Sequence, residues 1–354
     1  MKKPGYTEIF FFIAMIIGIK AHSCLTAEVI YFIHQPQMAL EQRIQSALHL
    51  AMKKFDGREI WLAYSLDSNA VQSLDAQTSH QERMEQQPLT QLLMQDAAGL
   101  PALLVLDYSL ESGYPYLHHA YIFPENDRGT EEIRPTIWLG VRSAKQSLDW
   151  LQKQFYISKS PTLSKQLVHC IGMHGCEEAV IEFNRAVLFS QFSEPIKSEA
   201  LAGLSLQEAP ASIRTIVSVF SMNNAPNLKK RAIAELSQMQ DERAHRYIFS
   251  IASSGKDVRL RKEAIFWLAQ IGSDQAIQVL LQIFSSELDP AMKEYTIFSI
   301  GQLPQGRGHE ILCQIAETNS DERMREKARF WMGQSSAQRF NVLLKEMSDE
   351  QSVK

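Results

Sequence analysis

Cysteine is scarce in this chain. Its 354 residues include only Cys24, Cys170, Cys176 and Cys313. So few cysteines exclude a small scaffold held together by disulfides. The sequence also lacks a basic surplus, because 36 Lys and Arg stand against 40 Asp and Glu, for a net charge of -4. That balance carries no electrostatic footprint of a nucleic-acid binder, and we expect no nucleic-acid partner.

Signatures of catalysis are also missing from the sequence. It contains no G-x-S-x-G, H-E-x-x-H or C-x-x-C motif and no Gly-rich phosphate loop. His118 and His119 are adjacent in a strand-like run, and no nucleophile or carboxylate motif accompanies them. We therefore expect no catalytic, cofactor-binding or metal-binding residues, and we interpret the two histidines as structural.

One long apolar run is present, at the N-terminus. It spans 9–19 (IFFFIAMIIGI) and is flanked by lysines. A membrane-spanning helix needs about 20 apolar residues, whereas the core of a signal peptide needs about 7–15. We therefore predict a signal peptide over 1–27, cleaved near residues 23–27, and an exported, periplasmic protein. An uncleaved anchor, or lipidation of Cys24, is the less favoured alternative, and only then would this segment hold the protein at a membrane.

The C-terminal half repeats itself with a period of 32 residues. RKEAIFWLAQ (261–270), KEYTIFSIGQ (293–302) and REKARFWMGQ (325–334) are versions of the same ten letters. Apolar residues follow helical spacing in each, and a second amphipathic helix follows after a turn. One such hairpin cannot bury its apolar face alone, so we expect successive hairpins to stack. Trp267 and Trp331 are expected to fill the gaps between hairpins.

Four units are clear, at 227–258, 259–290, 291–322 and 323–354; a degenerate fifth covers 195–226 and a sixth begins near Leu167. Acidic residues recur where units meet, at Asp257, Asp289 and Asp321. An Asp at that point caps the N–H groups of a helix start. A basic residue four positions later, such as Arg261, is expected to pair with the Asp of a neighbouring unit.

The pattern D-x-x-x-[KR]-x-x-A-x-x-x-[LIM] resembles HEAT repeats in the short bacterial form related to phycobilisome lyases. The segments IFWLAQIG (265–272), FWMGQSS (330–336) and WLGVRSAKQSLDWL (138–151) are similar to a family of exported bacterial HEAT-repeat proteins whose role is unknown. The resemblance implies a curved solenoid whose concave wall, formed by the second helices, binds other macromolecules. A lyase-like activity would rest on fold analogy alone, and export argues against it.

Two columns of the second helices are candidates for the partner surface. With Ala244, Ala276 and Gly308 facing inward, one column holds His245, Ile277 and His309, and the next holds Phe249, Leu281 and Cys313. Contiguous exposed apolar surface marks an interaction site. The alternative is that neighbouring hairpins bury these columns.

The run HCIGMHGC (169–176) has three interpretations. His169, Cys170, His174 and Cys176 are of the types that bind zinc, although eight residues would then have to wrap one ion. Export would allow a disulfide between Cys170 and Cys176. Ordinary packing at the turn between two helices is the third interpretation.

Residues 28–158 lack the repeat. Helical spacing predicts helices at 39–54 and 143–155, and apolar runs between turn residues predict strands at 60–66, 102–110, 116–123 and 136–139. The stretch 77–95, rich in Gln and charge, is expected to be a loop. The sequence therefore predicts a mostly α protein: a signal peptide (1–27), a small α+β domain (28–158), and a C-terminal α-solenoid of about 5–6 HEAT-type hairpins (159–354).

The expected function is a non-enzymatic, exported scaffold or adaptor that binds a protein partner through the concave face of the solenoid. The rival is an envelope sensor or an enzyme whose site lies in 28–158, with the repeats as an adaptor. Contact of His118 or His119 with Asp107 or Glu111 would favour the rival.

Overall fold

The protein is described from a computed structural model, which covers residues 29–31, 38–55, 58–66, 102–110, 114–124, 134–175, 177–222 and 225–334. The predicted signal peptide, the loop expected at 77–95, Cys24, Glu111 and Cys176 lie outside these residues. Within the described ranges, no helix has the length and apolar character that crossing a membrane requires. The chain divides into two compact units, Met1–Gln207 and Glu208–Lys354.

Unit 1 is built on a β-sheet. Its described strands number five and lie in the order β1-β5-β2-β3-β4. The strands are β1 (Val29–Tyr31), β2 (Glu59–Leu66), β3 (Ala102–Ser109), β4 (Tyr116–Pro124) and β5 (Thr136–Arg142). β2, β3 and β4 are antiparallel neighbours, whereas β5 is parallel to both β2 and β1. The four strands expected from apolar runs are confirmed. β1 was missed because three residues are too few to show an alternating pattern.

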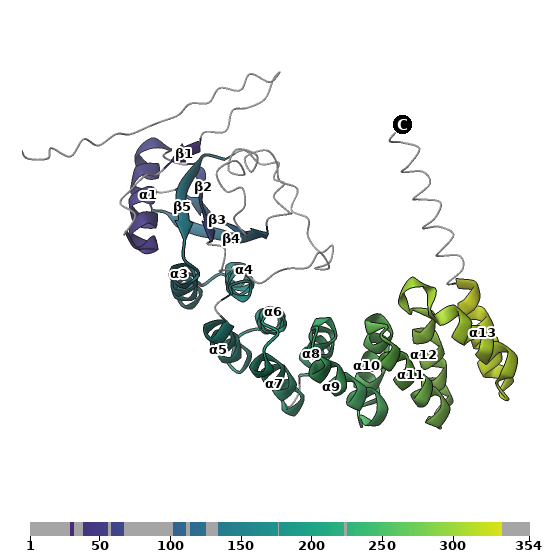
Figure 1. The fold of residues 1–354 in the computed structure, drawn as a ribbon. Coiled ribbons are helices and arrows are strands. Elements are labelled where there is room, and N and C mark those ends of the chain that lie inside the picture. The colour runs from purple at the N-terminus through teal and green to yellow at the C-terminus, as the bar shows by residue number, and fades with distance from the viewer. Residues whose placement is uncertain are drawn as a thin grey trace, which may run out of the picture. The chain divides into compact units, whose positions relative to one another are not determined.

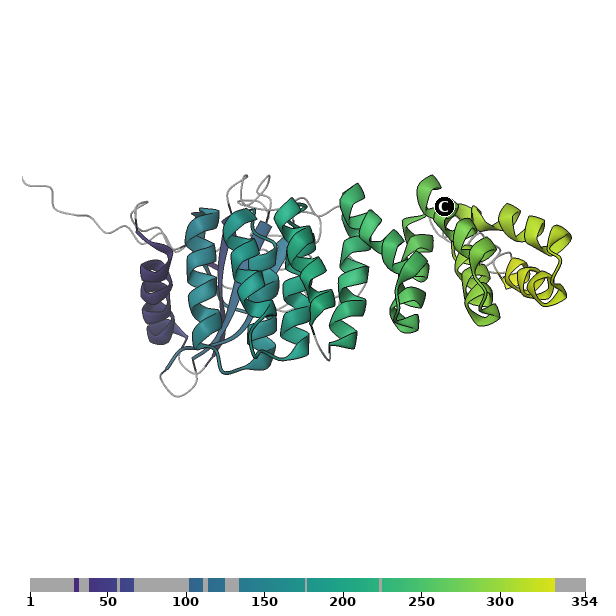
Figure 2. The same ribbon diagram turned by 90° about the horizontal axis from the view of Figure 1, so that it is seen from below.

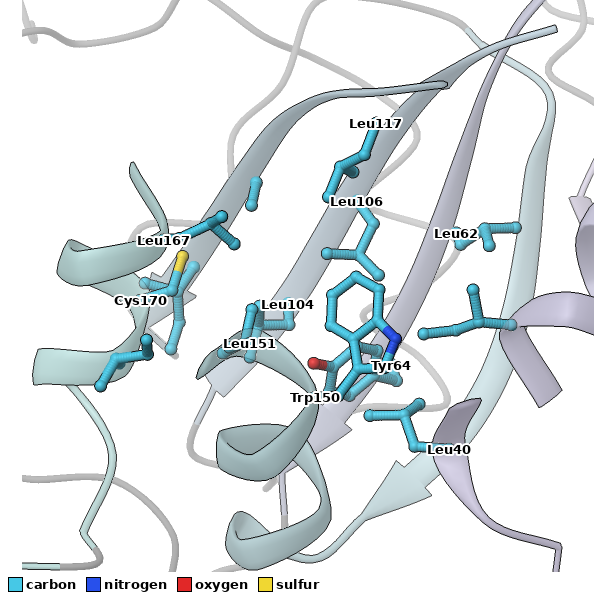
Figure 3. Packing of buried hydrophobic residues seen from close by; sticks show 14 of the residues in the cluster. Leu40, Leu62, Tyr64, Leu104, Leu106, Leu117, Trp150, Leu151, Leu167 and Cys170 are labelled. Carbon is cyan, nitrogen blue, oxygen red and sulfur yellow. The ribbon is translucent and has the colours of Figure 1, made fainter. Parts of the chain in front are cut away.

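Three helices cover one face of this sheet: α1 (Leu40–Lys54), α3 (Ala144–Ile157) and α4 (Pro161–Gly172) (Figure 1). Alternate residues of β2, β3 and β5 point toward them, as the two-residue period of a strand requires. Figure 3 shows Leu62 and Tyr64 of β2 converging with Leu40 of α1 and with Trp150 and Leu151 of α3. Each fully buried side chain of this size contributes about 1.5–3 kcal/mol, so the packing of these helices on the sheet stabilises the unit.

Two more helices, α5 (Glu177–Leu188) and α6 (Glu194–Ser205), complete unit 1 and share its apolar cluster. α4 and α6 cross at a pair of glycines. A Cβ atom on Gly172 would lie 2.6 Å from the Cα of Gly203, so neither position has room for a side chain. The sequence assigns α5 and α6 to the first repeats. Their contacts nevertheless place them in the unit that contains the sheet.

Unit 2 is a series of helical hairpins (Figure 2). It contains α7 (Pro210–Ser218), α8 (Pro226–Gln238), α9 (Glu242–Ser254), α10 (Val258–Ile271), α11 (Asp274–Ser286), α12 (Pro290–Gly301), α13 (Gly308–Thr318) and a further helix over 322–334. The first helices of successive hairpins begin at 226, 258, 290 and 322, one residue before the predicted unit boundaries. The structure thus confirms the predicted fold class, a small α+β part followed by an α-solenoid.

Candidate functional site

The first helices α10, α12 and 322–334 begin at capping aspartates, whereas α8 begins after Ala225, which provides no side-chain cap. Asp257 Oδ1 accepts the backbone N–H of Arg259 at 2.8 Å, Asp289 Oδ1 accepts that of Ala291 at 2.9 Å, and Asp321 Oδ1 accepts that of Arg323 at 2.9 Å. The predicted capping role is confirmed. Each cap stabilises its helix by about 1 kcal/mol and fixes where the hairpin starts.

The basic residues four positions later do not pair with these aspartates, so that prediction is wrong. Arg261 donates instead to the carbonyl of Ala252 at 3.1 Å and to Glu287 at 2.7 Å. Arg325 donates to the carbonyl of Asn319 at 2.6 Å. Because the Asp carboxylate already accepts helix-start N–H groups, the guanidinium binds the unpaired carbonyls at the end of the preceding segment.

Contacts between successive first helices recur with a fixed offset of 33 residues. Lys230 lies 3.8 Å from Glu263, and Glu294 lies 3.3 Å from Lys327. The ammonium of Lys262 lies 5.3 Å from the ring centre of Tyr295. These pairs hold the hairpins in register.

The ring of Trp331 follows the same offset and lies 4.8 Å from that of Phe298, measured between centres. A Cβ on Gly301 would lie 3.4 Å from the Cβ of Trp331. The gap-filling role expected for Trp331 is confirmed by these contacts. Trp267 donates from Nε1 to Glu263 at 3.0 Å, within its own helix.

The second helices carry the six candidate partner residues. Ala244, Ala276 and Gly308 are buried, as the predicted register requires. Of the candidates, His245, Phe249, Ile277, His309 and Cys313 are half-buried, while Leu281 is 38% exposed. Both columns are therefore accessible in part, and their role as a partner surface stays a prediction.

The HCIGMHGC run contains two histidines with different surroundings. His169 is exposed and its Nδ1 lies 2.7 Å from Glu199, whereas His174 is fully buried. Cys170 is a buried free thiol. No group of three or more His, Cys, Asp or Glu is placed to hold a metal in the described part of the chain. The disulfide from Cys170 to Cys176 stays a prediction, because Cys176 lies outside the described residues.

His174 belongs to a buried chain of hydrogen bonds. Its Nδ1 lies 2.7 Å from the carbonyl of Cys170, which can only accept, so Nδ1 carries the proton. Nε2 then accepts the hydroxyl of Ser147 at 2.9 Å, and Ser147 Oγ accepts that of Tyr64 at 2.8 Å. Burial lowers the pKa of His174 from 6.5 to about 4 and keeps the ring neutral. This chain of hydrogen bonds joins β2, α3 and the end of α4, and its side chains are buried.

The sheet places two of the residues named for the rival site on neighbouring strands. Asp107 on β3 lies opposite His119 on β4. Arg134 Nη1 donates to both carboxylate oxygens of Asp107 at 2.8 Å and lies 2.8 Å from Glu59. Burial raises the pKa of Asp107, while the Arg134 guanidinium opposes that rise. A carboxylate held on both oxygens by an arginine is arranged for ion pairing.

Comparison with known families identifies the array. A family model described as PBS lyase HEAT-like repeat matches residues 260–286, which cover most of α10 and all of α11. The array is built of HEAT-like repeats. No curated protein matches the chain.

Two solved structures resemble the chain weakly. Human deoxyhypusine hydroxylase in complex with glycerol is 14% identical over 54% of this chain and 85% of that one, with a TM-score of 0.25. A de novo designed 16-helix transmembrane nanopore is 15% identical over 59% of this chain and 65% of that one, with a TM-score of 0.15. The chain therefore spans less than two thirds of the nanopore subunit. At these TM-scores neither likeness bears on function.

One feature of the HEAT-like repeats escaped the sequence reading. The first helices carry six large aromatic side chains, none of which is buried: Phe266, Trp267, Tyr295, Phe298, Phe330 and Trp331. We call this set the aromatic ridge. The recurrence of Phe at 266, 298 and 330 with the period of 32 was a signal that could have found it.

Proposed function

We propose that the protein is a non-enzymatic, exported scaffold or adaptor that binds a partner protein through its HEAT-like repeats. What supports this most is the fixed register of successive hairpins, which leaves half-buried and exposed apolar side chains on adjacent helices. A surface of that kind is rigid, extended and partly apolar, which is what a protein partner recognises.

The second helices form one wall of this binding surface in our proposal. Leu281 is its most exposed member, and half-buried Phe249 and Cys313 stand at the equivalent positions of the neighbouring hairpins. Three apolar positions in line fit an amphipathic helix or an extended segment of the partner.

Photo-crosslinking tests this proposal. The full chain, expressed in its own host, would carry benzoylphenylalanine in place of Leu281, with the same replacement at Leu288 and at Val141 as controls. Leu288 is 93% exposed in the loop before α12, and Val141 is 45% exposed on β5. A light-dependent protein adduct at Leu281, and at neither control, supports the proposal. An adduct at Val141 alone would place the partner site in unit 1 and contradict it.

Export is tested separately by the mass of the purified mature protein. The proposal expects a chain that begins between residues 24 and 28, recovered from the periplasmic fraction. A full-length chain in the cytosol would refute export and leave partner binding open.

The rival function, a sensor or an enzyme with its site in unit 1, is favoured by one observation, the placement of His119 opposite Asp107. Replacing His118 and His119 together by alanine discriminates the two functions. Loss of the phenotype of the intact protein, with the Leu281 adduct retained, would favour the rival.

A further inference from the structure

The two layers of the helical array differ in charge. The first helices α8, α10, α12 and 322–334 carry eleven Lys or Arg and five Glu, a balance of +6. The second helices α9, α11 and α13 carry two Arg and four Asp or Glu, a balance of -2. The capping Asp257, Asp289 and Asp321 at the starts of first helices lower the balance of that layer from +6 to +3. In a chain whose net charge is -4, the first-helix layer is therefore still a locally basic surface.

The aromatic ridge lies on this basic layer. Tyr295, Phe298, Trp331 and Phe330 form a continuous run of ring contacts, with centres 4.8 to 5.5 Å apart, that passes from α12 to the next first helix. Phe330 is 55% exposed. Aromatic side chains beside Arg and Lys are the composition enriched at protein interfaces and at their energetic hot spots.

Two carboxylates of the first-helix layer already have partners. Glu263 accepts from Trp267 and lies near Lys230, while Glu294 pairs with both Arg323 and Lys327. The Lys and Arg side chains of the layer outnumber its carboxylates, so the net charge of the layer stays positive and would attract an anionic ligand.

From the aromatic ridge and this charge we infer that the first-helix layer docks an acidic polypeptide segment that carries apolar side chains. The inference rests on the proposed function, that the repeats bind a partner protein. It adds to the wall of second helices a docking surface on the first helices and states the chemistry of the segment that docks there. The apolar side chains of the segment would pack against the ridge, and its carboxylates would meet the surrounding Lys and Arg.

Single-stranded nucleic acid would also combine negative charge with flat rings, but the geometry favours a polypeptide. Bases stack on free ring faces. In the ridge, the rings of Phe330 and Trp331 meet at 84° and those of Phe266 and Trp267 at 80°, so within each pair one ring closes a face of the other.

Fluorescence anisotropy on the full chain tests the inference. The probe is a labelled peptide of roughly 15 residues that alternates Glu with Leu and Trp, a length that spans several helical turns. The controls are the same peptide with Lys for Glu, a Glu/Gly peptide, and a polyuridine oligonucleotide. We expect the acidic apolar peptide to bind at least about tenfold more tightly than every control, with an affinity that falls as salt is added.

Variants locate the bound peptide. Phe330→Ser and Arg259→Glu, both at exposed positions, should each lower the affinity for the acidic peptide by about tenfold. Leu288→Ser changes an exposed apolar residue outside the ridge and should leave that affinity unchanged. Equal affinity for the Lys peptide, preference for the oligonucleotide, or no binding would each overturn the inference. Loss of binding on Leu281→Glu but not on Phe330→Ser would also overturn it, while leaving the proposed function intact on the second helices.

Discussion

His174 Nε2 lies 2.9 Å from Ser147 Oγ in the interior of unit 1, and the imidazole is neutral there because burial lowers its pKa from 6.5 to about 4. Between these two pH values only the unfolded chain binds the proton. Lowering the pH below 6.5 therefore stabilises the unfolded state, and the full loss, roughly 3 kcal/mol, is reached below pH 4.

We therefore predict that the free energy of unfolding of unit 1 falls as the pH drops from 6.5 toward 4. Urea denaturation at several pH values measures this, and His174→Gln is the control because its side chain does not titrate. The variant should be less stable at pH 7 and should lose less stability on acidification. Identical pH dependence in the two proteins would show that His174 is not a buried neutral group.

Removing the Ser147 hydroxyl, the central group of this chain of hydrogen bonds, should also lower the stability of unit 1. Ser147→Ala leaves Tyr64 and His174 without their partner in a site that water does not reach. Each unsatisfied buried group costs about 1–3 kcal/mol, so we expect a clearly lower urea midpoint at pH 7. Ser285→Ala, on the exposed side of α11, should leave the midpoint within error. A change of similar size at both positions would contradict the account.

A third prediction concerns the close packing of α4 against α6. Gly172→Ala puts a Cβ 2.6 Å from the Cα of Gly203, so the two helices must separate, at a cost of about 1–3 kcal/mol. Gly333→Ala is the matched control, because Gly333 is helical and nothing lies within 4 Å of its Cβ position. There we expect no loss and a gain of up to about 1 kcal/mol, since alanine favours helix. Thermal unfolding of both variants measures the contrast.

The capping aspartates give a fourth prediction. Asp289→Ala removes the acceptor of the Ala291 N–H and should destabilise unit 2 by about 1 kcal/mol. Asp149→Ala removes only an exposed ion pair with Lys145 and should change stability by less than about 0.5 kcal/mol. Chemical denaturation compares them, and an equal effect would mean that the aspartates of the array do not cap.

Sequence periodicity predicts much of this fold because each hairpin of unit 2 repeats the same contacts. Ala264 and Leu268 are buried at equivalent positions to Ala232 and Leu236, so one correct unit predicts the next. The partners of Arg261 could not be predicted in the same way. Which carbonyls remain unpaired at a turn depends on backbone geometry, and the sequence shows only that a basic residue recurs.

Candidate sites were harder to predict for a similar reason. His169 and His174 are of a residue type that binds metals, yet one side chain is exposed and the other is fixed on Ser147 of α3. The aromatic ridge was overlooked because Trp267 and Trp331 read as gap-filling residues. Only the exposure of each ring in the folded structure distinguishes half-buried rings from core.

Amide hydrogen exchange on the full chain tests the central claim, the stacked array with a period of 32 residues. The account predicts slow exchange in the interiors of α8 to α13 and of 322–334, separated by fast exchange at 239–241, 255–257, 272–273, 287–289, 302–307 and 319–321. Uniformly fast exchange from 226 to 334, or protection that runs unbroken across those turns, would contradict it.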